Sequence, residues 1–220
     1  MRLNVEGLFI KVSGITNEED ALFSIALGAS AVGFDFGPTP RQISTVAAHD
    51  IVRRLPHGAV SVGVFRNEMP QRIVEVANTL GLTAVQIDGT IAMDELAYVA
   101  QRVNTVMRTL PSTTVIDSSL QLAGADYLLL PESDDYSSLV DCLETFLDET
   151  LRVPMVASGG LTTSNVIDVI QNYPVWGVDV RSAVETSPGI KDPVRLGEFI
   201  ANARWAFENT YVERHYDDWF

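Results

Sequence analysis

Residues 8–36 read LFIKVSGITNEEDALFSIALGASAVGFDF, and this stretch contains one complete strand–helix–strand unit. It begins and ends with short runs of large apolar residues, at Leu8–Val12 and Ala31–Phe36. Between these runs apolar residues recur at helical spacing, and Leu27-Gly28 is typical of a helix end. Thr16-Asn17-Glu18-Glu19 fits a capping box at the helix start. Because continuous apolar runs suit strands that are covered on both faces, the stretch predicts an α/β protein with a parallel sheet.

The same alternation continues along the chain. Eight strands with about eight helices, at about 27 residues per unit, are typical of a compact (β/α)₈ TIM barrel. No linker or repeat interrupts residues 1–220, so we expect a single barrel domain. A doubly wound open sheet is the alternative, but no Gly-x-Gly-x-x-Gly follows the first strand. The six further strands are expected over Ala59–Phe65, Thr83–Ile87, Thr113–Ile116, Asp126–Leu130, Val153–Ala157 and Val175–Val180.

The fifth unit is short. Only about nine residues, from Asp117 to Ala125, join the fifth expected strand to the sixth. A parallel crossover normally needs about a dozen residues or more. Either the fifth helix is shortened or the strand is misplaced.

Composition limits the partners. The chain has 15 basic and 29 acidic residues, a net charge of −14, which disfavours nucleic acid and anionic membranes. Cys142 is the only cysteine, so neither a disulfide framework nor a cysteine-based metal site is expected. The chain shows neither a run of about 18 apolar residues nor a signal peptide, and we expect a cytoplasmic location.

Three loops at strand ends are candidates for the active site, because the active sites of TIM barrels lie in the loops that follow the strands. Ser158-Gly159-Gly160 follows the seventh expected strand, and Arg181-Ser182-Ala183 follows the eighth. Backbone N–H groups in such loops commonly bind a phosphate. After the second strand, the glycine and two prolines of 37–40 stiffen a loop that ends in Arg41, which can pair with a carboxylate.

With these loops, the sequence resembles the phosphoribosylanthranilate isomerase family of tryptophan biosynthesis. The resemblance covers nearly the whole chain and follows the family's order of motifs. It rests on KVSGITNEEDA at 11–21, AVGF at 31–34, VGVF at 62–65, AVQ at 84–86, SGGLT at 158–162, GVDV at 177–180 and PGIKDP at 188–193.

The resemblance implies an Amadori rearrangement that converts N-(5′-phosphoribosyl)anthranilate to 1-(2-carboxyphenylamino)-1-deoxyribulose 5-phosphate. It implies no metal or organic cofactor. A general acid protonates the ribose ring oxygen, and a general base then removes the C2′ proton. By this resemblance Arg41 would hold the anthranilate carboxylate, Asp179 would contact the ribose or the anthranilate nitrogen, and the phosphate would lie on the N–H groups of Gly159, Gly160, Ser182 and Ala183. Gln86 would line the floor of the site, with Asp88 and Arg181 as further substrate-binding residues.

The chain departs from the family at the catalytic positions. The family's cysteine base is replaced by Ser13, and a serine hydroxyl needs an adjacent base to act. The family's aspartate acid is replaced by Leu130, and a histidine that is common in the family is replaced by Asp88. The eighth-strand serine-serine-glycine is replaced by Arg181-Ser182-Ala183.

Carboxylates at the strand ends are candidate substitutes. Clustered carboxylates raise one another's pKa, which can leave one as an acid and another as a base. Some of them can instead cap helices or face water. With Ser13 and Asp179, the catalytic candidates are Asp35, Asp117, Glu132 and Asp134.

Three functions stay open from the sequence. The first is an active isomerase, monomeric or homodimeric, whose partner is a small phosphorylated substrate. The second is a catalytically silent barrel that binds a phosphorylated sugar or an anthranilate conjugate. The third is an isomerase of a related aminoaldose phosphate, such as the ribonucleotide of histidine biosynthesis. The third is disfavoured because that substrate has two phosphates and the sequence offers one convincing phosphate site.

Overall fold

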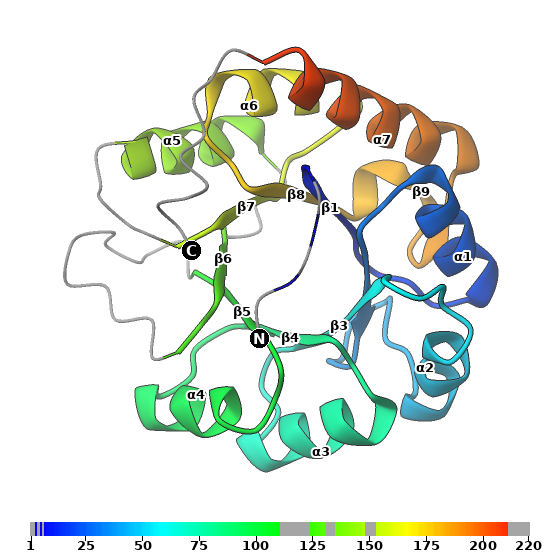
Figure 1. Cartoon of the computed structure of the whole chain (residues 1–220), viewed down its shortest axis with the longest axis vertical. Helices are drawn as coiled ribbons and strands as arrows, with labels where there is room; N and C mark the ends of the chain where they lie inside the picture. Colours follow the sequence, from blue (N-terminus) through cyan, green and yellow to red (C-terminus); the bar gives the residue numbers. More distant parts are fainter. Residues whose placement is uncertain are drawn as a thin grey trace.

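A computed structural model describes residues 3, 5, 7–110, 124–130, 135–147 and 153–210. Eight parallel strands close into a barrel in sequence order, and helices surround it (Figure 1). The TIM barrel expected from the sequence is therefore confirmed. The strands are β1 (Phe9–Val12), β2 (Ala31–Asp35), β3 (Val60–Phe65), β4 (Ala84–Asp88), β5 (Val106–Thr109), β6 (Tyr127–Leu129), β7 (Met155–Ser158) and β8 (Gly177–Val180).

The helices follow the strands around the outside of the barrel (Figure 1). They are α1 (Glu18–Leu27), α2 (Thr45–Val52), α3 (Pro70–Leu80), α4 (Met93–Ala100), α5 (Tyr136–Leu147), α6 (Val166–Asn172) and α7 (Pro193–Glu208). After β8 come the short 3-10 helix η1 (Ser182–Val184) and a hairpin of β9 (Glu185–Ser187) and β10 (Ile190–Lys191). No helix among the described residues is long and apolar enough to cross a membrane.

The barrel's fifth strand does not lie where the sequence predicts it, and the expected range Thr113–Ile116 lies outside the described residues. The barrel's fifth strand is β5, Val106–Thr109, which pairs with β4 and β6. Polar Arg108 and Thr109 interrupt its apolar run, whereas 113–116 is rich in β-branched residues. The connection to β6 now runs from Leu110 to Asp126, so the crossover is no longer too short. The shortened fifth helix was expected within 117–125, and most of that range lies outside the described residues.

The start of α1 differs from expectation by one residue. Asn17, not Thr16, caps the helix, because the Asn17 side chain accepts a hydrogen bond from Asp20 N at 2.8 Å. Thr16 Oγ1 donates instead to Gly189 O, at 2.6 Å. The other end is as expected, with Gly28 in the left-handed conformation at φ 105°.

Alternate residues of each strand face two different cores. On β1, Ile10 and Val12 pack outward against the helices, whereas Phe9 packs into the barrel. Inside, the rings of Phe9 and Tyr127 lie 4.6 and 4.4 Å from Trp176. Gly177 lets β1 and β8 approach, since a Cβ there would lie 2.5 Å from Phe9 O.

Buried polar residues lie at or near the carboxyl ends of the strands. They stand in place of the apolar residues that fill the rest of the barrel, and buried polar groups of this kind are typical of a functional site. They include Lys11, Ser13, Asp35, Gln86, Asp88, Thr109, Ser158 and Asp179.

Candidate active site

Three side chains from β1, its following loop and β8 form a closed hydrogen-bonded triangle. The register of β1 and β8 places Lys11 beside Asp179. Lys11 Nζ donates to Ser13 Oγ at 2.6 Å and to Asp179 Oδ2 at 2.7 Å. Ser13 Oγ donates to Asp179 Oδ1 at 2.7 Å. The Lys11 side chain is fully buried. Its positive charge in the Lys11–Ser13–Asp179 triangle is therefore stabilised by the Asp179 carboxylate.

Gly33 on β2 leaves room for this triangle. A Cβ at Gly33 would lie 3.0 Å from Ser13 Oγ and 3.3 Å from Lys11 Cε. The absence of a side chain at Gly33 therefore allows the Lys11 side chain to lie across the barrel interior.

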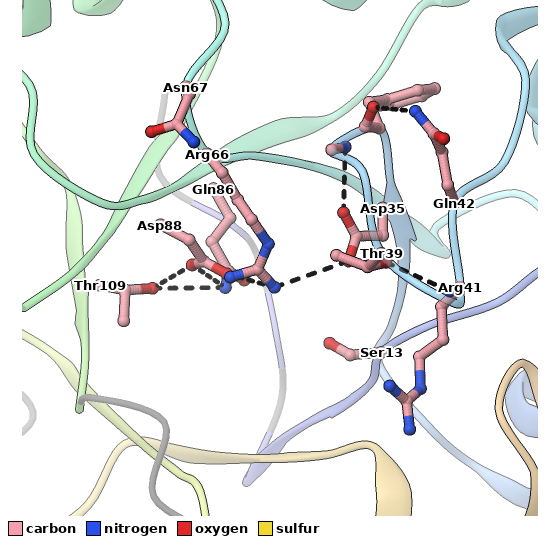
Figure 2. Close-up of polar contacts among 12 residues, drawn as sticks. Ser13, Asp35, Thr39, Arg41, Gln42, Arg66, Asn67, Gln86, Asp88 and Thr109 are labelled. Carbon is pink, nitrogen blue, oxygen red and sulfur yellow. Dashed lines mark hydrogen bonds and ion pairs between the residues drawn. The ribbon is translucent and has the colours of Figure 1, made fainter.

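A second polar group lies at the ends of β2, β3, β4 and β5. Arg66 follows β3 and reaches between two buried carboxylates (Figure 2). Its Nη2 lies 3.6 Å from Asp35 Oδ2 and 3.4 Å from Asp88 Oδ2. Asp35 is 3% exposed and Asp88 is 7% exposed, whereas the Arg66 side chain is 26% exposed. With Gln86 and Thr109, these residues make up what we call the acidic group.

Further donors fix the two carboxylates. Asp35 accepts hydrogen bonds from Gly37 N at 3.1 Å and Thr39 Oγ1 at 2.9 Å. Asp88 Oδ1 accepts from Gln86 Nε2 at 2.7 Å and from Thr109 Oγ1. Gln86 Nε2 also donates to Thr109 Oγ1 at 3.3 Å (Figure 2).

Arg41 lies against a carboxylate of the chain itself. Its Nε and Nη2 donate to Glu185 at 2.7 to 3.0 Å, in a bidentate pair. Lys191 Nζ donates to the same carboxylate at 2.8 Å and to Ser13 O at 2.5 Å. This Arg41–Glu185–Lys191 clamp joins the loops after β1, β2 and β8.

The clamp shifts the pKa of two of its members. Burial raises the pKa of Glu185, but hydrogen bonds and charges from Arg41 and Lys191 outweigh burial and lower it below the ordinary value. Burial lowers the pKa of Lys191, and the Glu185 carboxylate only partly offsets this effect.

The loop after β7 turns at two consecutive glycines. Gly159 and Gly160 have φ values of 81° and 61°, in the region that favours glycine. Asn165 holds the turn, because its Nδ2 donates to Gly160 O at 2.8 Å and its Oδ1 accepts from Thr162 N at 2.7 Å. A Cβ at Gly160 would lie 3.0 Å from the backbone of Asp135, so only glycine fits here.

Cationic side chains gather between the ends of β1 and β8. A Cβ at Gly14 would lie 2.6 Å from Arg41 Cδ and 3.3 Å from Arg181 Cγ, so both arginines pack over this glycine. This cationic side of the barrel mouth combines four basic residues with two carboxylates, and it meets the acidic group at the loop after β2. Its basic residues are Lys11, Arg41, Arg181 and Lys191, and its carboxylates are Asp179 and Glu185.

The structure brings together many of the site residues expected from the sequence, although their roles stay predictions. Ser13, Asp35, Gln86, Asp88 and Asp179 are all buried at the barrel mouth. Ser182 and Ala183 lie in η1, and Arg181 precedes it. The remaining catalytic candidates lie outside the described residues, namely Asp117, Glu132 and Asp134.

Sequence reasoning missed Arg66, and it did not assign Glu185 or Lys11 a role. Arg66 directly follows an apolar strand, as Ser13 does, and this position was the available signal. Arg66 places a cation between the carboxylates of Asp35 and Asp88.

In the loop after β6, Asp135 stabilises the start of α5. Asp135 accepts hydrogen bonds from Ser137 N and Ser137 Oγ at the start of α5, and these bonds lower its pKa. Leu130 is fully buried, and its carbonyl accepts a hydrogen bond from Ser158 Oγ at 2.5 Å.

No cluster of His, Cys, Asp and Glu side chains that could hold a metal ion occurs among the described residues.

Comparisons with known proteins identify the family. The model of the N-(5′phosphoribosyl)anthranilate (PRA) isomerase family matches residues 10–202. The N-(5′-phosphoribosyl)anthranilate isomerase of Thermotoga petrophila is 37% identical over 204 residues, which cover 89% of this chain and 98% of the relative.

Solved structures agree with this match. A phosphoribosyl anthranilate isomerase in complex with reduced 1-(o-carboxyphenylamino)-1-deoxyribulose 5-phosphate is 36% identical and has a TM-score of 0.76, covering 90% of this chain and 99% of that chain. Monomers generated from the dimeric enzyme of Thermotoga maritima are 34% identical with a TM-score of 0.72, covering 90% and 98%. The family resemblance expected from the sequence is confirmed: this chain belongs to the N-(5′-phosphoribosyl)anthranilate isomerase family.

Proposed function

We propose that this chain catalyses the Amadori rearrangement of N-(5′-phosphoribosyl)anthranilate, with the Lys11–Ser13–Asp179 triangle in place of the cysteine base. The observation that carries the proposal is the pair of hydrogen bonds at Ser13 Oγ, one from Lys11 Nζ and one to Asp179 Oδ1, at 2.6 and 2.7 Å. A serine hydroxyl needs an adjacent base, and Asp179 is in contact with it.

The triangle provides a route for the C2′ proton. As Ser13 Oγ takes this proton, its own proton passes along the hydrogen bond to Asp179 Oδ1. Lys11 Nζ keeps its hydrogen bonds to both residues, so the ammonium orients the serine and balances the carboxylate. Return of the proton to C1′ of the enolamine, with loss of the O2′ hydroxyl proton that restores the general acid, gives the ketone and restores the triangle.

The cationic side of the barrel mouth supports binding of a phosphorylated small molecule. Gly159 and Gly160 form a turn after β7, and Ser182 and Ala183 lie after the neighbouring strand, so their backbone N–H groups are the proposed phosphate donors. Arg181 and Lys11 add positive charge in a chain whose net charge is −14. Arg41 packs over Gly14 on this side of the mouth, and its guanidinium is proposed to bind the anthranilate carboxylate.

A general acid is also required. Of the carboxylates expected to replace it, Asp35 lies at the mouth, whereas Asp117, Glu132 and Asp134 lie outside the described residues. We expect the protein to be a monomer or a homodimer, which light scattering after size exclusion measures.

The test is steady-state turnover of freshly generated substrate. Ser13→Ala and Asp179→Asn are expected to lower kcat by about 10²–10⁴, the usual contribution of a positioned acid or base. Alanine variants of Asp35, Asp117, Glu132 and Asp134 identify the acid, since one of them is expected to lower kcat by a similar factor. Glu75→Gln, on the exposed face of α3, is the matched control. A wild-type protein without turnover overturns the proposal.

One observation favours a second candidate, a catalytically silent barrel that binds the same class of ligand. Leu130, at the family's acid position, is fully buried and carries no proton to donate. Titration calorimetry with the reduced product analogue separates the two functions. Binding without turnover supports the silent barrel, and binding with turnover supports the isomerase.

A further inference from the structure

The acidic group has more hydrogen-bond acceptors than donors. Each ionised carboxylate offers about four lone-pair sites. Asp88 Oδ2 lies 3.4 Å from Arg66 Nη2, which is longer than a normal hydrogen bond, so this oxygen has capacity for a further donor. Asp35 Oδ2 has a similar distance to Arg66, 3.6 Å, beside one good hydrogen bond from Thr39.

Gln86 adds an independent sign of a missing donor. Its Nε2 donates to Asp88 and Thr109, which fixes the amide so that Oε1 points away from both. Gln86 is 4% exposed, and within the part of the chain that the structure describes no group donates a hydrogen bond to Oε1. Buried carbonyl oxygens without a donor are rare in folded proteins, so this one indicates a ligand group.

The charge of the acidic group limits which ligand fits. Two carboxylates surround one guanidinium, so a second anion would be repelled there, whereas an uncharged N–H or O–H donor would be attracted. The anthranilate carboxylate is therefore excluded from this group, which agrees with its proposed place at Arg41.

The proposed orientation of the substrate would bring its aromatic end toward the acidic group. Figure 2 shows Ser13 with Arg41 on one side and the Asp35–Arg66–Asp88 pairings on the other. If the phosphate lies between β7 and β8 and the carboxylate at Arg41, as proposed, the opposite edge of the ring would face Arg66, which is more exposed than Asp35 and Asp88.

We propose that Gln86 and Asp88 form a subsite for a hydroxyl or amino group on the ring, so that the preferred substrates are phosphoribosyl conjugates of ring-hydroxylated or ring-aminated anthranilates. This inference rests on the proposed function, because it uses the same orientation of the sugar phosphate. The donor hydrogen-bonds to Asp88 Oδ2 and Gln86 Oε1, the two acceptors with unused capacity.

Calorimetric titration of the full chain with a series of reduced product analogues tests the subsite. The series contains the unsubstituted 2-carboxyphenyl parent, its ring-hydroxylated and ring-aminated isomers, and a form with a second ring carboxylate. At least one hydroxylated or aminated isomer is expected to bind about 10- to 100-fold more tightly than the parent, as hydrogen bonds to charged groups do. The dicarboxylate is expected to bind at least about tenfold more weakly than the parent.

Variants assign the preference to the subsite. Asp88→Asn and the apolar Gln86→Leu are expected to bring the affinity ratio of donor-bearing to parent analogue close to one, whereas Glu75→Gln retains it. The ratio is used because a partly unfolded variant lowers both affinities alike. If Asp88→Asn does not fold, Gln86→Leu and the wild-type comparison decide.

The outcomes separate the two proposals. If every analogue binds no more tightly than the parent, the subsite is overturned and the proposed function stands. If the parent and all its derivatives fail to bind, the proposed function is overturned. If only the donor-bearing isomers bind, the subsite is supported and unsubstituted anthranilate is replaced as the substrate.

Discussion

At the scale of single residues, Ser13 is the position where the family resemblance implies a cysteine base. Its hydroxyl is held between an ammonium and a carboxylate, so the pair of neighbours around it is already suited to stabilise an anion or pass a proton. A substitution at Ser13 alone therefore tests how Lys11 and Asp179 affect the group at this position.

The variant Ser13→Cys is expected to introduce a new ionisation into the pH dependence of kcat/KM. A thiol has an ordinary pKa of about 8.5, and an adjacent lysine ammonium lowers it. Activity of the variant is therefore expected to rise with pH and to level off below about pH 8.5. The wild-type profile is the control. Superimposable profiles would show that residue 13 does not handle the proton.

Lys11 is expected to matter for stability as well as for chemistry. The variant Lys11→Met leaves the buried Asp179 carboxylate without its cation, at a cost of about 3–5 kcal/mol in the free energy of unfolding. Urea denaturation measures this loss. The double variant Lys11→Met/Asp179→Leu is expected to regain much of it, because no buried charge remains.

The matched control is the exposed Arg72–Glu75 pair on α3, where Glu75→Gln is expected to cost less than about 1 kcal/mol. A loss of similar size in Lys11→Met and Glu75→Gln would contradict the buried-charge argument.

At the scale of structural elements, the clamp holds the loops after β1, β2 and β8 in fixed relation. Glu185 lies at the start of the β9–β10 hairpin and Lys191 at its end. The Glu185 carboxylate contacts both Lys191 and Arg41, and so it holds the hairpin against the loop after β2. The hairpin thereby forms part of the wall of the cationic side.

The clamp is expected to make stability fall in acid. The folded-state pKa of Glu185 lies below its ordinary value of 4.5, so its contribution is fully present above about pH 4.5 and is lost as pH falls through the lowered pKa. Thermal unfolding of wild type between pH 7 and 3 measures the decline. Glu185→Gln is expected to be less stable by about 3–5 kcal/mol at pH 7 and to approach wild type in acid. A constant difference at every pH would contradict this assignment.

At the scale of the whole molecule, the barrel was predictable because eight similar units repeat one hydrophobic pattern. The prediction was wrong at β5, where Arg108 and Thr109 are inserted into the barrel wall and break that pattern. The candidate site was predictable at strand ends, where position alone marks Asp35, Asp88 and Asp179. Pairings such as Arg66 with two carboxylates depend on side-chain directions across three strands, and a single sequence does not specify these.

The net charge of −14 predicts an unusual salt response. The proposed substrate is an anion, so long-range repulsion slows its association and salt screens that repulsion. Raising the ionic strength from about 10 to about 150 mM is expected to increase the association rate constant of the reduced product analogue about two- to tenfold. Stopped-flow binding measures this rate. An analogue without phosphate and carboxylate is the control and is expected to show no change. A decrease with salt would mean that the local cations govern approach.

The triangle joins residues that lie 168 positions apart, at the first and the last strand of the barrel. During synthesis, a chain that ends before β8 contains the lysine and the serine but lacks the carboxylate that completes their arrangement. Incomplete chains therefore lack the proposed proton-transfer apparatus, which is complete only once β8 has joined the barrel. Contacts across so many residues also slow folding, so activity is expected to be among the last properties that a newly made molecule acquires.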